Sequence, residues 1–392
     1  MIRVYLRRFV GLLAAVAVLT EAFSLCLFAG TNDQHINGTS GTVTPAGDWP
    51  VFRGDPLQTG VATSTLPNEL AVRWKFRTKD AIEGTAAILG NSVYVGSMDG
   101  RLYALDLATG RQLWNYKAGP FKGPVGVHGG AVYAGDLDGT FHCVDAGTGA
   151  KRWTFDVGTD ITSGVNFEGE RVLFGAQDET LRCLSARDGK EVWKFKVPGG
   201  PVMGTPAVFG DRTFVSGCDS NLHVLDTAKG KEVASVDLEG QTGASVAVAG
   251  AQIYIGTMSN QVLDVDLKKA QVRWRYESAR QQPFYASAAV TDALVIVGCR
   301  DKRVYALDRK TGREVWSFQT KRKVDSSPVV VDKRVFAASS DGNLYELDLA
   351  RGTKLHQFEL SKEGITASPA VGGHCLVIGS TEGVVYCLGA KR

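Results

Sequence analysis

A fourteen-residue pattern recurs eight times along this 392-residue chain, at a nearly constant spacing. The first copy, VYVGSMDGRLYALD, begins at residue 93, and the others begin at 132, 172, 213, 253, 295, 335 and 376. Each copy alternates its apolar positions with period two and is rich in β-branched and aromatic residues, which predicts strands and excludes helical repeats. A period of roughly 40 residues built from such runs is typical of one four-stranded antiparallel blade per repeat. The sequence therefore predicts an all-β, eight-bladed β-propeller over residues 70–392.

Turn residues divide the first repeat into four expected strands, at residues 84–89, 92–97, 101–107 and 111–118. The turns contain Gly, Asn or Asp, which tolerate a positive φ or bond their own backbone. After the second strand, seven of the eight repeats carry an acidic residue, and the fifth has Ser259 instead. We expect these acids on one face as turn formers, although a ring of acids could also bind cations or a basic partner. They are Asp99, Asp138, Asp178, Asp219, Asp301, Asp341 and Glu382.

A tryptophan ends an eleven-residue motif, ALDLATGRQLW at 104–114, which spans the third turn and the outer strand of the repeat. One further copy of the tryptophan, Trp74, lies one repeat length before Trp114 and has no strands of its own before it, while the last repeat has no outer strand. We therefore predict that residues 70–78 form the outer strand of the eighth blade and close the ring, which removes open edges. The large indoles are expected to fill the joints between blades. The structural motif residues are Trp74, Asp106, Gly110, Trp114, Asp145, Gly149, Trp153, Gly189, Trp193, Asp226, Asp266, Trp274, Asp308, Gly312, Trp316 and Asp348.

Residues 1–30 have the order of an export signal, in which arginines precede an apolar run. Small residues at Ala22 and Ser24 fit cleavage of a signal peptide, whereas the apolar character of residues 9–30 also fits an uncleaved membrane anchor. Cys26 would suit lipidation, but the residue before it is a leucine, where a small residue is expected. The sequence predicts an exported protein of the periplasm or cell envelope.

Charge is balanced along the chain, with 44 basic and 41 acidic residues and a formal net charge of +3. No run of like charge provides the electrostatic surface that nucleic acid requires. We therefore expect no nucleic-acid partner.

The eleven-residue motif resembles the pyrroloquinoline quinone (PQQ) repeat, AxDxxTGKxxW, through Ala104, Asp106, Thr109, Gly110 and Trp114. The resemblance extends from about residue 70 to the end of the chain. It implies an eight-bladed propeller of one of two classes: quinoprotein dehydrogenases that hold PQQ and calcium, or cofactor-free envelope scaffolds similar to the BamB family of outer-membrane protein assembly. Residues 31–69 are expected to be a linker and lead-in segment. Within them, DWPVFRGDPLQTGVA at 48–62 resembles the lead-in of non-enzymatic PQQ-like proteins and is expected to pack across the propeller.

The sequence favours the scaffold class. The resemblance implies that a dehydrogenase of this family would show adjacent cysteines beside the cofactor and a carboxylate and amide set for calcium, which needs six or more oxygen ligands. None of the seven cysteines is adjacent to another or has metal-ligand spacing, and Cys143, Cys183 and Cys387 share one strand position as expected small core residues. We expect no catalytic residue, no cofactor and no metal. A PQQ- and calcium-dependent quinoprotein oxidoreductase remains the alternative.

Links between successive blades are expected to frame the mouth of the central channel, and their charged and aromatic residues break an otherwise small-residue pattern. These residues are predicted to form a surface for a protein partner in the cell envelope, although they could also be ordinary solvated loop residues. The longest link, ESARQQPFYAS at 277–287, with an exposed Phe and Tyr, is the best single candidate for a protein contact. The candidate residues are Glu83, Lys122, Asp160, Phe284, Tyr285, Lys323 and Asp325.

Overall fold

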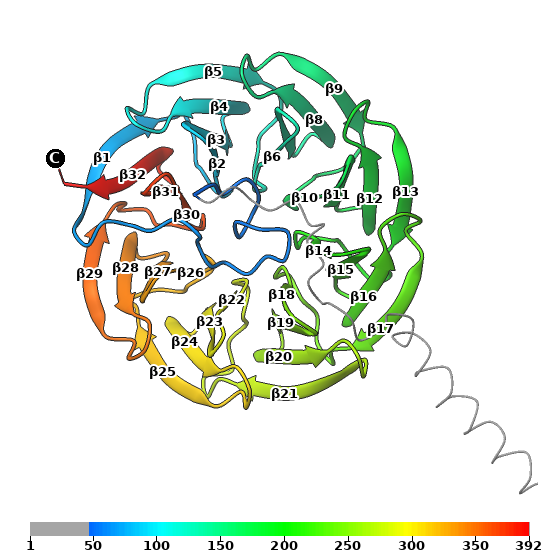
Figure 1. Cartoon of the computed structure of the whole chain (residues 1–392), viewed down its shortest axis with the longest axis vertical. Coiled ribbons are helices and arrows are strands. Elements are labelled where there is room, and N and C mark those ends of the chain that lie inside the picture. The colour runs from blue at the N-terminus through cyan, green and yellow to red at the C-terminus, as the bar shows by residue number, and fades with distance from the viewer. Residues whose placement is uncertain (1–46, 392) are drawn as a thin grey trace, which may run out of the picture.

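The computed structural model describes residues 47–391 of the chain. This part contains 32 strands, arranged as a ring of eight four-stranded antiparallel sheets (Figure 1). The predicted eight-bladed β-propeller is therefore confirmed. The expected signal peptide or anchor and the first part of the linker lie outside the described residues. Within the described part, no helix is long and apolar enough to cross a membrane.

Blades 1 to 4 follow one another in chain order, each from an innermost to an outermost strand. Blade 1 consists of β2 (Ala87–Leu89), β3 (Ser92–Ser97), β4 (Arg101–Asp106) and β5 (Gln112–Lys117). Blade 2 consists of β6 (Gly126–His128), β7 (Ala131–Gly135), β8 (Thr140–Asp145) and β9 (Lys151–Asp156). Blade 3 consists of β10 (Val165–Glu168), β11 (Arg171–Gly175), β12 (Thr180–Ser185) and β13 (Glu191–Lys196). Blade 4 consists of β14 (Ala207–Phe209), β15 (Arg212–Ser216), β16 (Asn221–Asp226) and β17 (Glu232–Asp237).

Blades 5 to 8 repeat this order and return to the start of the ring. Blade 5 consists of β18 (Ala247–Ala249), β19 (Gln252–Gly256), β20 (Gln261–Asp266) and β21 (Gln271–Glu277). Blade 6 consists of β22 (Ala289–Val290), β23 (Leu294–Cys299), β24 (Arg303–Asp308) and β25 (Glu314–Gln319). Blade 7 consists of β26 (Val329–Val331), β27 (Arg334–Ala338), β28 (Asn343–Asp348) and β29 (Lys354–Glu359). Blade 8 consists of β30 (Ala370–Gly372), β31 (Cys375–Gly379), β32 (Val384–Ala390) and β1 (Leu70–Arg77).

Ring closure occurs in blade 8, where β1 pairs antiparallel with β32 from Leu70↔Ala390 to Arg77↔Val384. A bulge between Val72 and Trp74 shifts the register within this pair. The first and last strands of the described chain thus share one sheet, as the position of Trp74 in the sequence predicts. Closure pairs the edge of β32 that would otherwise be open.

The innermost strand of blade 1 is shorter than the sequence predicts. In blade 1 the strand begins at Ala87 rather than at residue 84. The preceding residues belong to the link, which lies so close to blade 2 that a Cβ on Gly84 would be 2.3 Å from the carbonyl oxygen of Gly123. Crowding near the axis of the ring therefore ends β-pairing early, because the blades converge there.

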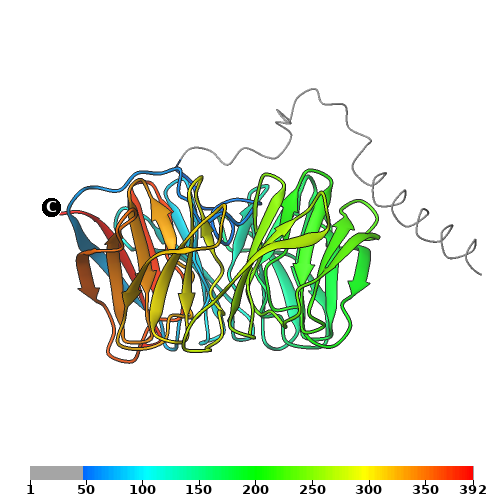
Figure 2. The ribbon, with the colours of Figure 1, turned by 90° about the horizontal axis from the view of Figure 1, so that it is seen from below.

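The lead-in segment (residues 47–69) runs along the inside of the ring, in the middle of Figure 1 and on the upper side in Figure 2. Its backbone carbonyls accept hydrogen bonds from the innermost strand, or the residue after it, in all eight blades. The segment is thus a hub that ties every blade, which is more than the expected packing across the propeller. Its partners in blade order are Ile88, Val127, Asn166, Val208, Val248, Val290, Val330 and Gly373.

Arg53 anchors this hub and is only 1% exposed. Its guanidinium donates to the carbonyl oxygens of Ser327 at 3.1 Å and Ala288 at 3.2 Å, and also to that of Pro328. Burial lowers the pKa of Arg53 to about 9. Arg53 therefore has a structural role, because its side chain joins the residues that directly precede the innermost strands of blades 6 and 7.

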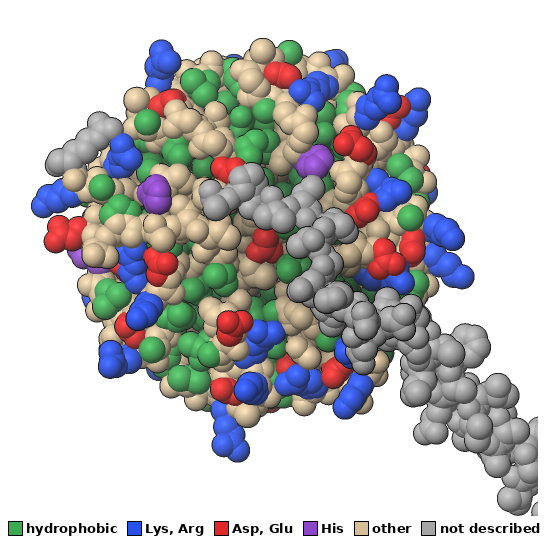
Figure 3. All heavy atoms as spheres, in the orientation of Figure 1, with side chains coloured by type: hydrophobic (Ala, Val, Ile, Leu, Met, Phe, Trp, Pro, Cys, Tyr) green, Lys and Arg blue, Asp and Glu red, His purple; other side chains and the backbone are tan. Residues whose placement is uncertain are grey.

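Two faces of the ring can now be told apart. The lead-in face carries the turns after each innermost strand, since Gly90 N donates to Asp48 Oδ1 at 2.9 Å there. On this face acidic and basic side chains are interspersed (Figure 3), so it presents no field of one sign. Because the strands are antiparallel, the links between blades and the turns between the second and third strands lie on the opposite face. We call it the mouth face.

Candidate interaction surface

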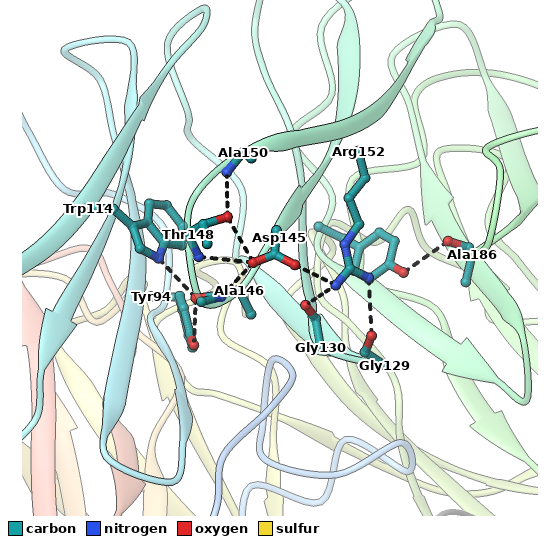
Figure 4. Close-up of polar contacts among 12 residues, drawn as sticks. Tyr94, Trp114, Gly129, Gly130, Asp145, Ala146, Thr148, Ala150, Arg152 and Ala186 are labelled. Atoms are coloured by element: carbon teal, nitrogen blue, oxygen red, sulfur yellow. Dashed lines mark hydrogen bonds and ion pairs between the residues drawn. The ribbon is translucent and has the colours of Figure 1, made fainter.

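The repeated motif forms the joints between blades. In the first joint, Trp114 Nε1 donates to the carbonyl oxygen of Ala146 in blade 2 at 2.9 Å (Figure 4). Its ring lies against Gly149, where an added Cβ would be 2.7 Å from Trp114 Cδ2. The same bond recurs in five further joints, so the tryptophan of the motif lies between neighbouring blades there. The pairs are Trp74–Leu107, Trp153–Ala186, Trp193–Thr227, Trp274–Arg309 and Trp316–Leu349.

The motif aspartates shape the turn that receives the tryptophan. Asp145 Oδ1 accepts the backbone N–H and the hydroxyl of Thr148, at 3.0 and 2.9 Å (Figure 4). Arg152 donates to Asp145 Oδ2 at 2.7 Å, and this bond together with those from Thr148 lowers the pKa of Asp145 to about 2. Backbone N–H groups are held in the same way by the other motif aspartates, so these carboxylates act as turn acceptors. They are Asp106, Asp226, Asp266, Asp308 and Asp348.

One buried residue anchors each link on the mouth face. Its backbone N–H donates to a carbonyl oxygen at the end of the second strand of the blade that precedes the link. Phe284 is such a residue: it is 0% exposed, and its N donates to the carbonyl oxygen of Thr257 at 3.0 Å. A Cβ on Gly256 would lie 2.7 Å from Phe284 Cβ, so the glycine at the end of the second strand makes room for the ring. The prediction that Phe284 is an exposed contact residue was wrong, because the link folds this side chain into the core. The corresponding residues are Ile82, Phe121, Ile161, Val202, Thr242, Val324 and Ile365.

A chain of hydroxyl groups connects the links around much of the ring. Ser245 Oγ accepts from the backbone N of Thr205 at 2.8 Å, and Ser287 Oγ accepts from the N of Ser245 at 3.0 Å. The same bond recurs from Ser287 to Ser327 and from Ser327 to Ser368. The backbone of the mouth face is therefore fixed from blade to blade, and its outward side chains project from a defined frame.

The acids after the second strands serve as local acceptors. Asp99 Oδ2 accepts from the backbone N of Lys79 at 3.0 Å and from the hydroxyl of Tyr103 at 2.7 Å. Asp341 makes the equivalent bonds to Lys321 N and to the Tyr345 hydroxyl, at 2.9 and 2.8 Å. Burial and this carboxylate together raise the pKa of Tyr345. These bonds support a turn-forming role for the acids.

Three of the predicted interaction residues come together on the links that flank blade 6. Asp325 accepts two bonds from Arg300, at 2.8 and 3.1 Å, and Lys323 Nζ lies 2.7 Å from the same carboxylate. The guanidinium of Arg300 lies over the ring of Tyr285, 3.8 Å from its centroid. Its hydrogen bonds to Asp325 raise the pKa of Arg300. Sequence reasoning missed Arg300, because it lies in a turn and its two partners belong to different links.

The remaining candidates lie apart from this cluster, on the links near blades 1 to 3. Glu83 and Lys122 form a half-exposed ion pair of 3.5 Å between adjacent links. Asp160 is exposed, and its backbone carbonyl accepts from Gln177 N at 3.1 Å. The structure thus divides the predicted surface into two groups on different sides of the ring (Figure 1).

The candidate carboxylates of the mouth face do not converge on one point among the described residues. Two of the candidate carboxylates are paired with cations, Glu83 with Lys122 and Asp325 with Arg300 and Lys323. Between residues 47 and 391 no group of three or more His, Cys, Asp or Glu side chains converges as a metal site. Calcium takes six to eight oxygen ligands, and no cluster of three carboxylates is available to it among residues 47–391.

Comparison with known proteins identifies the family. The family model described as outer membrane protein assembly factor BamB matches residues 68–142, 137–283 and 281–392. The chain belongs to the BamB family. The structure of BamB from Moraxella catarrhalis is similar, with a TM-score of 0.70 and 22% identity, over 83% of this chain and 98% of that one.

Quinoprotein enzymes share the fold of this BamB-family chain. Quinohemoprotein alcohol dehydrogenase from Comamonas testosteroni aligns with a TM-score of 0.77 and 14% identity, over 95% of this chain and 84% of that one. The quinoprotein glucose dehydrogenase of Escherichia coli (strain K12) is 32% identical over 130 residues, which is 26% of this chain. That match spans only 16% of the length of the enzyme. Fold likeness alone does not carry an activity over.

Proposed function

We propose that this protein is a non-catalytic β-propeller of the cell envelope that binds a partner protein through its mouth face, in the assembly of outer-membrane proteins. The observation that carries the proposal is the contrast between the two kinds of residue in each repeat. The tryptophans of the motif form the joints between blades, and its aspartates form the turns. The outward side chains of the links differ from blade to blade, on a backbone that hydrogen bonds hold in place. Membership of the BamB family and the export-signal pattern of residues 1–30 support the location and the process.

Site-specific photocrosslinking tests this proposal. A benzophenone amino acid is placed at Glu83, Asp160 or Lys323 on the mouth face, and at Asp211 or Asp292 on the lead-in face as matched exposed controls. Irradiation of the envelope fraction should give discrete crosslinked products from mouth-face positions and none from the controls. Equal labelling from both faces, or no product from the mouth face, would refute the proposal.

A quinoprotein oxidoreductase is the second candidate, and the local match to glucose dehydrogenase favours it. The pure protein is incubated with PQQ and calcium, desalted, and assayed for quinone absorbance and for dye-linked oxidation of alcohols and sugars. The scaffold proposal expects neither signal. Retention of the quinone together with oxidation would replace the scaffold by the enzyme.

A further inference from the structure

Two methionines and a tyrosine close over Gly243 on the mouth face. A Cβ on this glycine would lie 2.9 Å from Met258 Cε, 3.2 Å from Met203 Cε and 3.3 Å from Tyr285 Cε1. The three side chains come from separate elements, namely the link after blade 3, the second turn of blade 5 and the link after blade 5. All three are partly exposed. We call this group the Met–Tyr cap.

The cap is an exception within the repeat. Gly243, Met203 and Tyr285 occupy one position of the link, directly after the buried anchor residue. The other links carry polar residues at that position, so this link position lacks a polar side chain only before blades 4 to 6. Those polar residues are Glu83, Lys122, Thr162, Asp325 and Thr366. The packing of the ring therefore does not require apolar side chains here.

The positions of the methionines also favour a binding role for the cap. The chain has four methionines, and the three within the described residues, Met98, Met203 and Met258, all lie on the mouth face rather than in the core. A methionine side chain is flexible and polarizable, so it adapts to the shape of an apolar ligand and is frequent at peptide-binding surfaces. Partly exposed methionines that converge on one point thus favour a binding role.

Positive charge lies directly beside the cap. Arg300 and Lys323 carry two positive charges against the single negative charge of Asp325, which leaves an excess of one. Arg300 also touches the cap, through the ring of Tyr285. An apolar ligand side chain on the cap would therefore place a neighbouring carboxylate next to a basic pair.

Acidic groups around the cap are engaged by local hydrogen bonds or by a cation. Blade 5 is the one repeat whose turn has no acid, since Ser259 follows Met258. In blade 4, Asp219 is bonded to His223 at 2.8 Å, and in blade 6, Asp301 accepts from the Tyr305 hydroxyl. Glu239 on the intervening link is paired with Arg275 at 2.8 Å. The positive charge that an acidic ligand group would meet at the cap is therefore that of Arg300 and Lys323.

We infer that the Met–Tyr cap, with Arg300 and Lys323, is a docking site for a peptide segment of a partner protein in which a bulky apolar side chain stands next to an acidic residue. The inference rests on the proposed scaffold function and specifies the chemistry that its mouth face recognises. The apolar side chain packs on the two methionines and Tyr285. The carboxylate bonds Lys323 and the outer edge of Arg300.

Methyl NMR of the full chain tests the site with a defined probe. The protein is labelled with [¹³C-methyl]methionine and titrated with the peptide acetyl-Gly-Ser-Phe-Asp-Gly-amide. The signals of Met203 and Met258, assigned with Met203→Leu and Met258→Leu variants, should shift with saturation. The signal of Met98 lies on the same face outside the cap and should stay in place as an internal control. Absence of saturable shifts at Met203 and Met258 up to millimolar peptide would overturn the inference.

Matched peptides and variants test the recognition chemistry. Replacing Phe by Ala or Asp by Lys in the peptide should abolish the shifts, and Lys323→Gln should weaken binding about fivefold, as expected for a half-exposed charge pair. Equal binding of the Asp and Lys peptides would refute the charge argument. If a Met203→Ser/Met258→Ser variant keeps the photocrosslinked partner, the scaffold proposal stands and the docking site is wrong. If no mouth-face crosslink forms at all, the proposed function fails independently.

Discussion

The joint between blades 1 and 2 predicts a strong coupling between Gly149 and Trp114. Gly149 has a φ of +73°, and a Cβ there would lie 2.7 Å from two atoms of the indole. Gly149→Ala should therefore cost about 1–2 kcal/mol for the left-handed backbone and about 1–3 kcal/mol for overpacking against the ring. Trp114→Ala alone should cost about 3–5 kcal/mol.

The double variant separates the two contributions. With the indole removed, Gly149→Ala should cost only the backbone penalty, so the coupling energy equals the overpacking share of about 1–3 kcal/mol. The chain contains a natural counterpart: blade 4 has Ala234 in place of the tryptophan, and the facing residue of blade 5 is Ala270, with a φ of +50°. The indole and the glycine that faces it are thus both absent from this joint.

Urea unfolding followed by fluorescence and circular dichroism measures the four free energies of unfolding. Gly158→Ala is the matched control, because Gly158 has a φ of +78° and no heavy atom within 4 Å of its added Cβ. The control should lose about 1–2 kcal/mol only. If Gly149→Ala costs the same with and without Trp114, or no more than Gly158→Ala, the joint does not work as described.

Three further predictions address buried groups. Asp264 is 0% exposed, and burial raises its pKa to about 6, so the folded state keeps a proton that the unfolded state has lost. Stability should therefore fall by up to about 3 kcal/mol from pH 4 to 7, and Asp264→Asn should flatten this trend in urea midpoints measured across that range. Arg53→Met should cost at least about 2 kcal/mol because three carbonyls lose their donor; unchanged hydrogen exchange at Val290 and Val330 would contradict the hub. Phe284→Ala should lower stability by about 3–5 kcal/mol in thermal melts, whereas an exposed phenylalanine would give almost no change.

Sequence reasoning located the blades and the closing strand because both depend on local periodicity. Trp74 lies one repeat length before Trp114, and a strand without a blade can only complete the blade that lacks one. The position of Phe284 was misjudged because its burial depends on Gly256, which lies on a strand of the preceding blade. Alignment of the links would have given the signal, since Ile82, Phe121 and Val324 occupy the same position.

The sequence by itself determined the repeat, the strand order, the turn chemistry and the point at which the ring closes. These follow from the alternation of apolar residues and from short-range bonds such as those of Asp145, which involve neighbours along the chain. Only the tertiary structure decided which link residues face outward and which of them meet. Tyr285, Arg300 and Asp325 come together because curvature of the ring brings separate links side by side, and no local pattern encodes that distance.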